Sequence, residues 1–103
     1  MSSERRTSPR VQILGRLFGH VVALDVPVAV TEMSLGGMRI EVGIPFEAGT
    51  THAFLLTLGD GSTARLTGIV VHCRPVAKTA YALGIQFTGD EPAVVADVLK
   101  SVR

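Results

Sequence analysis

Most of this chain consists of short segments in which apolar and polar residues alternate, and this pattern constrains the fold more than any other feature. The alternation is clearest at 38–42, 52–58 and 79–88. A period of two is typical of strands that bury one face. Glycine, proline and aspartate separate the segments, so each strand is expected to end in a turn.

The alternating segments predict strands at 11–23, 28–33, 38–42, 52–58, 64–74 and 79–88, with turns at 24–26, 36–37, 45–50, 59–62 and 75–78. The turn at 59–62 has the composition of a hairpin. The pair Gly36 and Gly37 is expected to break the ladder because glycine enters positive φ without penalty. The segment 64–74 has apolar residues on both faces, so the pattern leaves its inward face open.

The end of the chain follows a different period. After Pro92 the apolar residues recur at helical spacing, at Val94, Val95, Val98, Leu99 and Val102. Asp90 and Glu91 precede this segment, where the positive end of a helix favours acidic groups. We therefore expect an all-β fold with a C-terminal helix, in which six short strands form a small antiparallel β-barrel and the helix covers it.

Composition favours one domain with an N-terminal extension. A chain of 103 residues with 47% apolar and 18% charged residues can bury a single core. Residues 1–10 contain no apolar residue after Met1 and cannot bury enough surface to order themselves. The expected organisation is a flexible basic arm at 1–10 and a barrel domain with its helix at 11–103.

The net charge of +1 conceals an uneven distribution. Residues 1–16 contain four arginines and one glutamate, whereas the remainder contains six Lys or Arg against eight Asp or Glu. A basic arm on a slightly acidic body is better suited to a small anion than to a long nucleic acid. Aromatic residues make up only 5%, which also argues against stacking along a polynucleotide. An RNA or DNA binder that uses the arm is a weaker alternative.

The sequence predicts a reduced cytoplasmic protein without membrane insertion. No apolar run reaches the roughly 18 residues that span a bilayer, because Asp25 and Pro27 interrupt the valine-rich stretch. The N-terminus lacks the hydrophobic stretch of a signal peptide. Cys73 is the single cysteine of the chain and cannot form an internal disulfide.

Neither a catalytic nor a metal site is predicted. His20, His52 and His72 are too far apart in sequence to form a metal-binding motif. Cys73 follows His72, but adjacent residues of a strand point to opposite faces, so a nucleophile and base pair is not expected there. No paired carboxylates suggest acid and base catalysis, and no cofactor is expected.

Two short motifs could bind an anion. Arg6 and Arg10 are spaced as RxxxR, and a guanidinium group matches phosphate oxygens with two parallel bonds and can stack on a base. In the run 32–37, Glu32 and Ser34 could present a carboxylate and a hydroxyl to a ligand where Gly37 allows close approach of the backbone. Each motif alone has a simpler explanation, a solvated tail for the arginines and a bulge between strands for the glycines.

Taken together, the order of these elements resembles the PilZ domain family along nearly the whole chain. The resemblance is carried by Arg6 and Arg10, by the Ser-Leu-Gly-Gly turn at 34–37, by the Gly-Ile-Gln-Phe strand end at 84–87 and by the closing helix. It implies a bacterial β-barrel that binds the second messenger cyclic di-GMP. On this resemblance Arg6 and Arg10 grip phosphate and guanine, and Arg5 affects how many nucleotide molecules are held.

The turn carries the remaining expected ligand contacts, with one departure. Ser34 and Gly37 match the family's turn, whereas Glu32 stands where the family usually has Asp or Asn. The function that the resemblance implies is a sensor that changes conformation on binding cyclic di-GMP and signals to an unknown downstream protein. The alternative, which Glu32 favours, is a PilZ-like barrel that binds no nucleotide and acts as a protein-interaction module.

Overall fold

The computed structural model describes residues 11–89 and 92–102. Over these residues the chain forms strands β1 (Val11–Val21), β2 (Val26–Met33), β3 (Gly37–Val42), β4 (Thr51–Thr57), β5 (Thr63–Ala77) and β6 (Ala80–Phe87), followed by helix α1 (Pro92–Ser101). The expected all-β fold with a C-terminal helix is confirmed. The arm expected at 1–10, with Asp90 and Glu91 ahead of the helix, lies outside the described residues.

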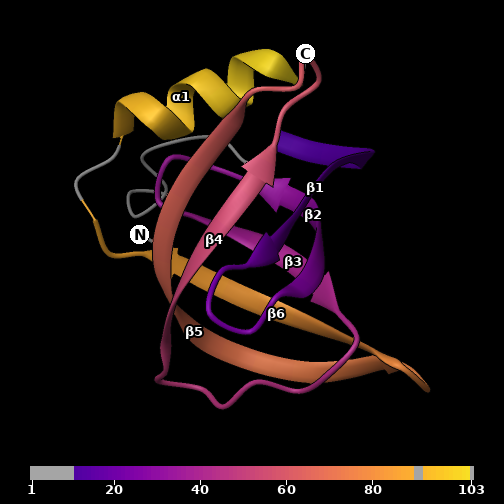
Figure 1. Cartoon of the computed structure of the whole chain (residues 1–103). Helices are drawn as coiled ribbons and strands as arrows, with labels where there is room; N and C mark the ends of the chain where they lie inside the picture. The colour runs from indigo at the N-terminus through magenta and orange to yellow at the C-terminus, as the bar shows by residue number, and fades with distance from the viewer. Residues whose placement is uncertain (1–10, 90–91, 103) are drawn as a thin grey trace, which may run out of the picture.

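The strands close into the expected antiparallel barrel (Figure 1), and their order around it is β1-β2-β3-β6-β5-β4. Chain neighbours pair in β1-β2-β3 and in β4-β5-β6. Two ladders join these halves, β3 with β6 and β1 with β4. The pairing of β1 with β4 at Phe18–Val21 closes the sheet and reduces the edge that is available for pairing with other chains.

The core is apolar and fills the interior of the barrel. Its fully buried side chains include Leu17, Val21, Val30, Met33, Ile40, Phe54, Leu56, Leu66, Val70 and Leu83. Helix α1 covers one end, where Figure 1 shows it lying across the ends of β4 and β5. Val95 and Val98 face this core and are almost completely buried. The predicted helical period therefore corresponds to the face that seals the barrel.

A bulge in β2 reverses which side chains face inward. Val30 pairs with Ile40 and Glu32 pairs with Arg39, so Thr31 is an additional residue in the ladder. The Thr31 hydroxyl donates a hydrogen bond of 3.2 Å to the carbonyl oxygen of Arg39 across the strands. Because the side chains of a strand alternate with a period of two, one additional residue shifts the alternation. Glu32 therefore lies on the outer face.

A second bulge, in β5, has the same effect. Val70 pairs with Ile85 and His72 pairs with Gly84, which leaves Val71 as the additional residue. Before the bulge the even-numbered residues from 64 to 70 are buried, whereas beyond it Cys73 packs against the core. This resolves the open question of the inward face of this strand. His72 and Cys73 lie on opposite faces, as expected from their adjacency.

Two local predictions are wrong. The turn expected at 75–78 begins later, because β5 continues to Ala77 and Pro75 pairs with Tyr81. Among the described residues this end of β5 pairs with β6 alone, and proline is tolerated on such an edge. Gly36 and Gly37 are also not in the positive φ region, which in the described chain holds Asp25, Gly49 and Gly61. Packing, described below, explains the glycine at position 37.

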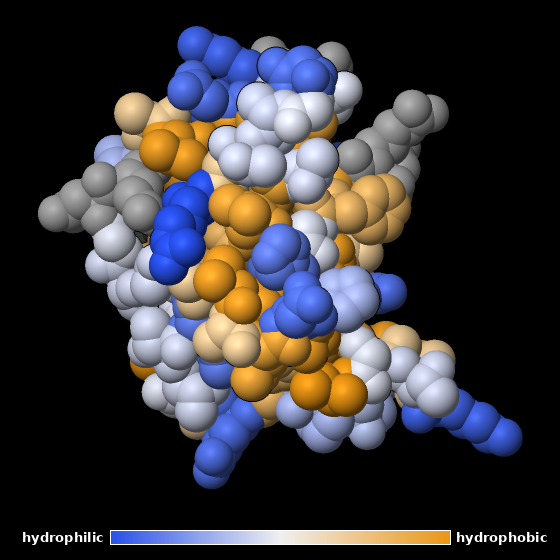
Figure 2. All heavy atoms as spheres, viewed as in Figure 1, coloured by the Kyte–Doolittle hydropathy of each residue, from blue (hydrophilic) through white to orange (hydrophobic). Residues whose placement is uncertain are grey.

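The surface in Figure 2 shows hydrophobic residues down the middle of the visible face, interrupted by hydrophilic side chains. The large apolar side chains that are exposed come from several strands and turns: Phe18, Leu24, Leu35, Ile44, Val71 and Val76. Within the described part of the chain, no helix combines the length and apolar character that crossing a bilayer requires.

Candidate functional site

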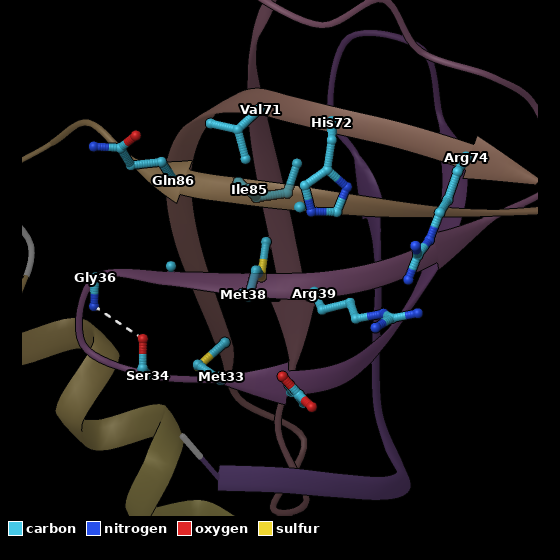
Figure 3. Close-up of a pocket in the computed structure, with 13 residues that line it drawn as sticks. Met33, Ser34, Gly36, Met38, Arg39, Val71, His72, Arg74, Ile85 and Gln86 are labelled. Carbon is cyan, nitrogen blue, oxygen red and sulfur yellow. Dashed lines mark hydrogen bonds between the residues drawn. The ribbon is translucent and has the colours of Figure 1, made fainter. Parts of the chain in front are cut away.

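A pocket of about 510 Å³ lies on the barrel wall formed by β2, β3, β6 and β5, beside the turn between β2 and β3 (Figure 3). This volume is within the range of roughly 300–1,000 Å³ that is typical of small-molecule sites. Its polar lining consists of Glu32, Ser34, Arg39, His72, Arg74 and Gln86. Because β2 and β3 are followed by β6 and then β5 in the barrel, the pocket crosses the β3–β6 ladder, one of the two that join the halves of the chain.

The floor of the pocket is a row of residues from four adjacent strands. Glu32 on β2 pairs with Arg39 on β3, Arg39 pairs with Gly84 on β6, and Gly84 pairs with His72 on β5. Directly opposed residues of antiparallel strands have their Cβ atoms about 5 Å apart and share a face. The two bulges bring Glu32 and His72 into this row, since without them both side chains would point toward the core.

The turn between β2 and β3 is held by hydrogen bonds at both of its ends. The backbone N–H of Ser34 donates to the carbonyl of Gly37 at 2.9 Å, and the N–H of Gly36 donates to the Ser34 hydroxyl at 3.3 Å. The N–H of Phe87 donates to the carbonyl of Gly36 at 2.9 Å, which attaches the turn to the end of β6. The hydroxyl of Ser34 is therefore fixed at the rim of the pocket (Figure 3).

Gly37 allows β3 and β6 to approach closely. A Cβ atom at this position would collide with the carbonyl oxygen of Ile85, and would lie 3.3 Å from its carbonyl carbon and 3.4 Å from the Cα of Gln86. These are backbone atoms, which cannot move aside without disturbing the ladder. At Gly36 a Cβ would meet nothing within 4 Å. The requirement for glycine in this turn is therefore steric, and it applies to Gly37 but not to Gly36.

The pocket lining carries more positive than negative charge. Arg39 and Arg74 contribute two guanidinium groups, Glu32 contributes one carboxylate, and His72 adds an imidazole. Arg39 is half-buried, whereas Arg74 and His72 are exposed. A concave wall with this balance favours an anion, because both guanidinium groups can donate charge-assisted hydrogen bonds to it. Glutamine and serine provide neutral donors and acceptors beside them.

The structure brings together three of the residues predicted from the sequence. Glu32, Ser34 and Gly37 all line this pocket. The other three, Arg5, Arg6 and Arg10, lie outside the described residues. In the part of the chain that is described, His, Cys, Asp and Glu form no group of three that could hold a metal ion.

Sequence reasoning missed Arg39, His72, Arg74, Gly84 and Gln86 as pocket residues. Arg39 could have been found, because it occupies an outward position of a strand that the alternation predicts and directly follows the turn. His72 and Arg74 could not be assigned to the pocket from the sequence, because the position of the bulge at Val71 determines which face of β5 they occupy. Gly84 and Gln86 lie in the Gly-Ile-Gln-Phe strand end that carries part of the family resemblance, but the resemblance implies no ligand contact there.

Comparisons with known proteins give one consistent result. The family described as PilZ domain matches residues 4–102. A solved structure of the PilZ domain of YcgR from Escherichia coli with c-di-GMP has a TM-score of 0.73 at 15% identity, covering 95% of this chain and 88% of that chain. A crystal structure of YcgR from Escherichia coli in complex with c-di-GMP has a TM-score of 0.71 at 16% identity, covering 93% of this chain and 43% of that chain.

At these identities the two structures show a shared fold. The chain spans less than half of the longer YcgR chain. None of the curated proteins matches it. The family match covers nearly all of the sequence, including the segment that contains the arginine pair and the turn at 32–37. The chain therefore belongs to the PilZ domain family.

Proposed function

We propose that this protein binds cyclic di-GMP in the pocket on the wall of β2, β3, β6 and β5. The observation that carries the proposal is the convergence of Glu32, Ser34 and Gly37 with Arg39 and Arg74 around one cavity of about 510 Å³. The family match and the two YcgR structures, which contain c-di-GMP, support this ligand. Arg6 and Arg10 complete the site from the N-terminal segment, with Arg5 beside them.

The chemistry of the lining suits each part of this ligand. Its two phosphodiesters are anionic, and guanidinium groups bind such oxygens with two parallel hydrogen bonds. The O6 and N7 atoms of guanine accept from arginine in the same way. A carboxylate such as that of Glu32 accepts from the N1 and N2 donors of the base. Ser34 can donate or accept at the rim.

The required affinity explains why several arginines are needed. Binding at about 1 μM requires roughly 8 kcal/mol, whereas an exposed ion pair contributes only about 0–1 kcal/mol. Charge-assisted hydrogen bonds contribute about 1.5–3 kcal/mol each, so several of them acting together can reach this value. Removal of one arginine should weaken binding by about tenfold or more.

Calorimetric titration of cyclic di-GMP into the purified protein tests the proposal. We expect a saturable signal for the parent and a loss of at least tenfold in affinity for Arg6→Ala and for Arg10→Ala. Arg65→Ala is the matched control, because Arg65 is exposed on β5 and does not line the pocket. Equal affinities for the parent and an Arg6→Ala, Arg10→Ala double variant would refute the assigned roles.

We further propose that residues 1–10 close over the bound nucleotide and that this change signals to a downstream protein. Ordering a segment costs free energy that ligand contacts must exceed, which makes the transition dependent on ligand. Trypsin cleaves after arginine, so cyclic di-GMP should slow the cleavage at Arg5, Arg6 and Arg10. Unchanged cleavage at saturating nucleotide would exclude this conformational change.

The alternative function is that of a protein-interaction module that binds no nucleotide. Glu32 favours it, because its additional methylene moves the carboxylate relative to the shorter Asp or Asn side chain. Titration of Glu32→Asp separates the two functions. Binding by the parent protein excludes the alternative, whereas binding that appears only in Glu32→Asp supports it.

A further inference from the structure

His72 occupies an unusual position on the floor of the pocket. It pairs with Gly84 across the ladder between β5 and β6. A Cβ atom at Gly84 would lie 2.7 Å from the Cδ2 and 2.9 Å from the Cε1 of His72, and closer still to Nε2. The imidazole therefore packs directly on the backbone of Gly84, in the space that any other residue would fill.

This packing holds the imidazole over the pocket rather than in the core. His72 is exposed to solvent and lines the cavity together with Val71 and Arg74 of the same strand. Figure 3 shows the side chains of Arg39 and Arg74 at the same end of the pocket, near the imidazole. A ligand that fills the cavity between the turn and these arginines would contact His72.

The described charged side chains that line the pocket with His72 come from β2, β3 and β5, and Glu41 lies on β3 one outward position beyond Arg39. Arg74 on β5 and Arg39 on β3 oppose a positive charge on the imidazole, whereas Glu32 on β2 favours it. The pocket residues of β6 are Gly84, Ile85 and Gln86, which do not ionise. A bound dianion among these groups adds a strong attraction for the imidazolium form, since opposite charges within about 4–6 Å favour ionisation.

We propose that His72 is a ligand-contacting residue of this pocket and that its protonated form strengthens the binding of the cyclic dinucleotide. The inference rests on the proposed function, since it assigns an additional contact and a pH dependence to the same site. Imidazole is the side chain that ordinarily changes charge near pH 6.5. Phosphodiesters remain ionised throughout this range, so the ligand's charge does not change with it.

The expected effect follows from proton linkage. If the bound ligand makes the imidazole hold its proton about tenfold more tightly, affinity is up to about tenfold higher where the imidazole is protonated than where it is neutral. Binding near pH 7 is then accompanied by proton uptake. Calorimetry in two buffers with different ionisation enthalpies measures this uptake directly, independently of the affinity itself.

The experiment titrates cyclic di-GMP into the full chain at pH 6, 7 and 8 in both buffers. His72→Gln removes the charge but keeps a polar side chain, and we expect its affinity to be independent of pH and close to that of the parent at pH 8. His72→Arg carries a permanent charge, and we expect it to bind at every pH about as tightly as the parent does at pH 6. His20→Gln is the control, because His20 lies on β1 outside the pocket lining, and it should keep the parent profile.

The outcomes separate the two proposals. A parent protein that binds with the same affinity and without proton uptake at all three pH values, or a His72→Gln variant that keeps the parent profile, overturns the role of His72 and leaves nucleotide binding intact. Absence of binding by the parent at every pH overturns the proposed function and this inference with it.

Discussion

Substitution of Gly37 tests whether the close approach of β3 and β6 requires glycine at this position. The adjacent Gly36 provides a matched control. Gly37→Ala places a methyl group against the backbone of Ile85 and Gln86, at distances of 3.3 and 3.4 Å from two of their carbon atoms and closer to the Ile85 oxygen. Non-bonded carbon atoms prefer about 3.5–4.0 Å. Strands β3 and β6 must therefore separate locally for the alanine to fit.

The expected cost is that of overpacking, about 1–3 kcal/mol of unfolding free energy. For a domain of this size each kcal/mol lowers the melting temperature by about 4–8 °C, so Gly37→Ala should melt roughly 5–20 °C below the parent. Gly36→Ala should be neutral or slightly stabilising, because its methyl group meets nothing within 4 Å and alanine restricts the unfolded chain.

Thermal and urea unfolding, monitored by circular dichroism, give the melting temperature and the free energy of unfolding of both variants. Hydrogen exchange of the β3 and β6 amides then locates the disturbance, which should be confined to the ladder near Gly37 in the alanine variant. Equal melting temperatures for the two variants would refute the steric requirement for glycine at position 37.

Two further predictions concern the core and the β4–β5 turn. Phe54→Ala should lower the free energy of unfolding by about 3–5 kcal/mol in a urea titration, because Phe54 is completely buried. Phe18→Ala should lower it much less, because the Phe18 side chain is 53% exposed. Equal losses for the two variants would contradict this prediction. In the turn, Asp60 Oδ1 accepts hydrogen bonds from the Ser62 hydroxyl at 2.6 Å and the Ser62 N–H at 2.9 Å, and these bonds lower the pKa of Asp60. Their stabilisation is thus present above the unfolded pKa near 3.9 and is lost as pH falls through the folded pKa; Ser62→Ala should raise the pKa of Asp60 in a carboxyl NMR titration, and an unchanged value would refute this cause.

Much of the fold follows from local pattern in the sequence. The regular alternation at 79–88 corresponds to β6, and the helical period after Pro92 corresponds to the face of α1 that is buried. These elements could be predicted because a single period determines both their type and their inward side chains. The order of the strands does not follow from local pattern, because β3 pairs with β6 and β1 pairs with β4 across long sequence separations.

The two bulges explain why the alternating pattern does not predict which side chains of β2 and β5 face the pocket. In β2 and β5 an additional residue, Thr31 or Val71, shifts the alternation within one strand. A bulge depends on how the partner strand pairs, so the sequence of the bulged strand alone does not reveal it. Glu32 belongs to a motif and could be recognised despite this, whereas His72 has no motif and its sequence context indicates only a surface or packed histidine.

The proline at position 75 is a second case in which local sequence does not predict the structure, here the end of a strand. Proline usually ends a central strand, yet in this barrel β5 continues past it because its far end pairs on one side with β6 among the described residues. Whether a strand is central or at an edge is a property of the assembled sheet. Local propensity therefore places the turn too early in the chain.

The pocket crosses the β3–β6 ladder, so a ligand bound there contacts both halves of the chain at once. Ile40 and Leu83, which pair in that ladder, are distant in sequence, and contacts of this kind carry the largest loop-closure entropy. A fragment that ends before β6 contains the turn and its serine yet has no opposite wall. A molecule that occupies this cavity bridges the half formed by β1, β2 and β3 and the half formed by β4, β5 and β6. Its presence should therefore slow global unfolding more than local fraying of β1 or α1.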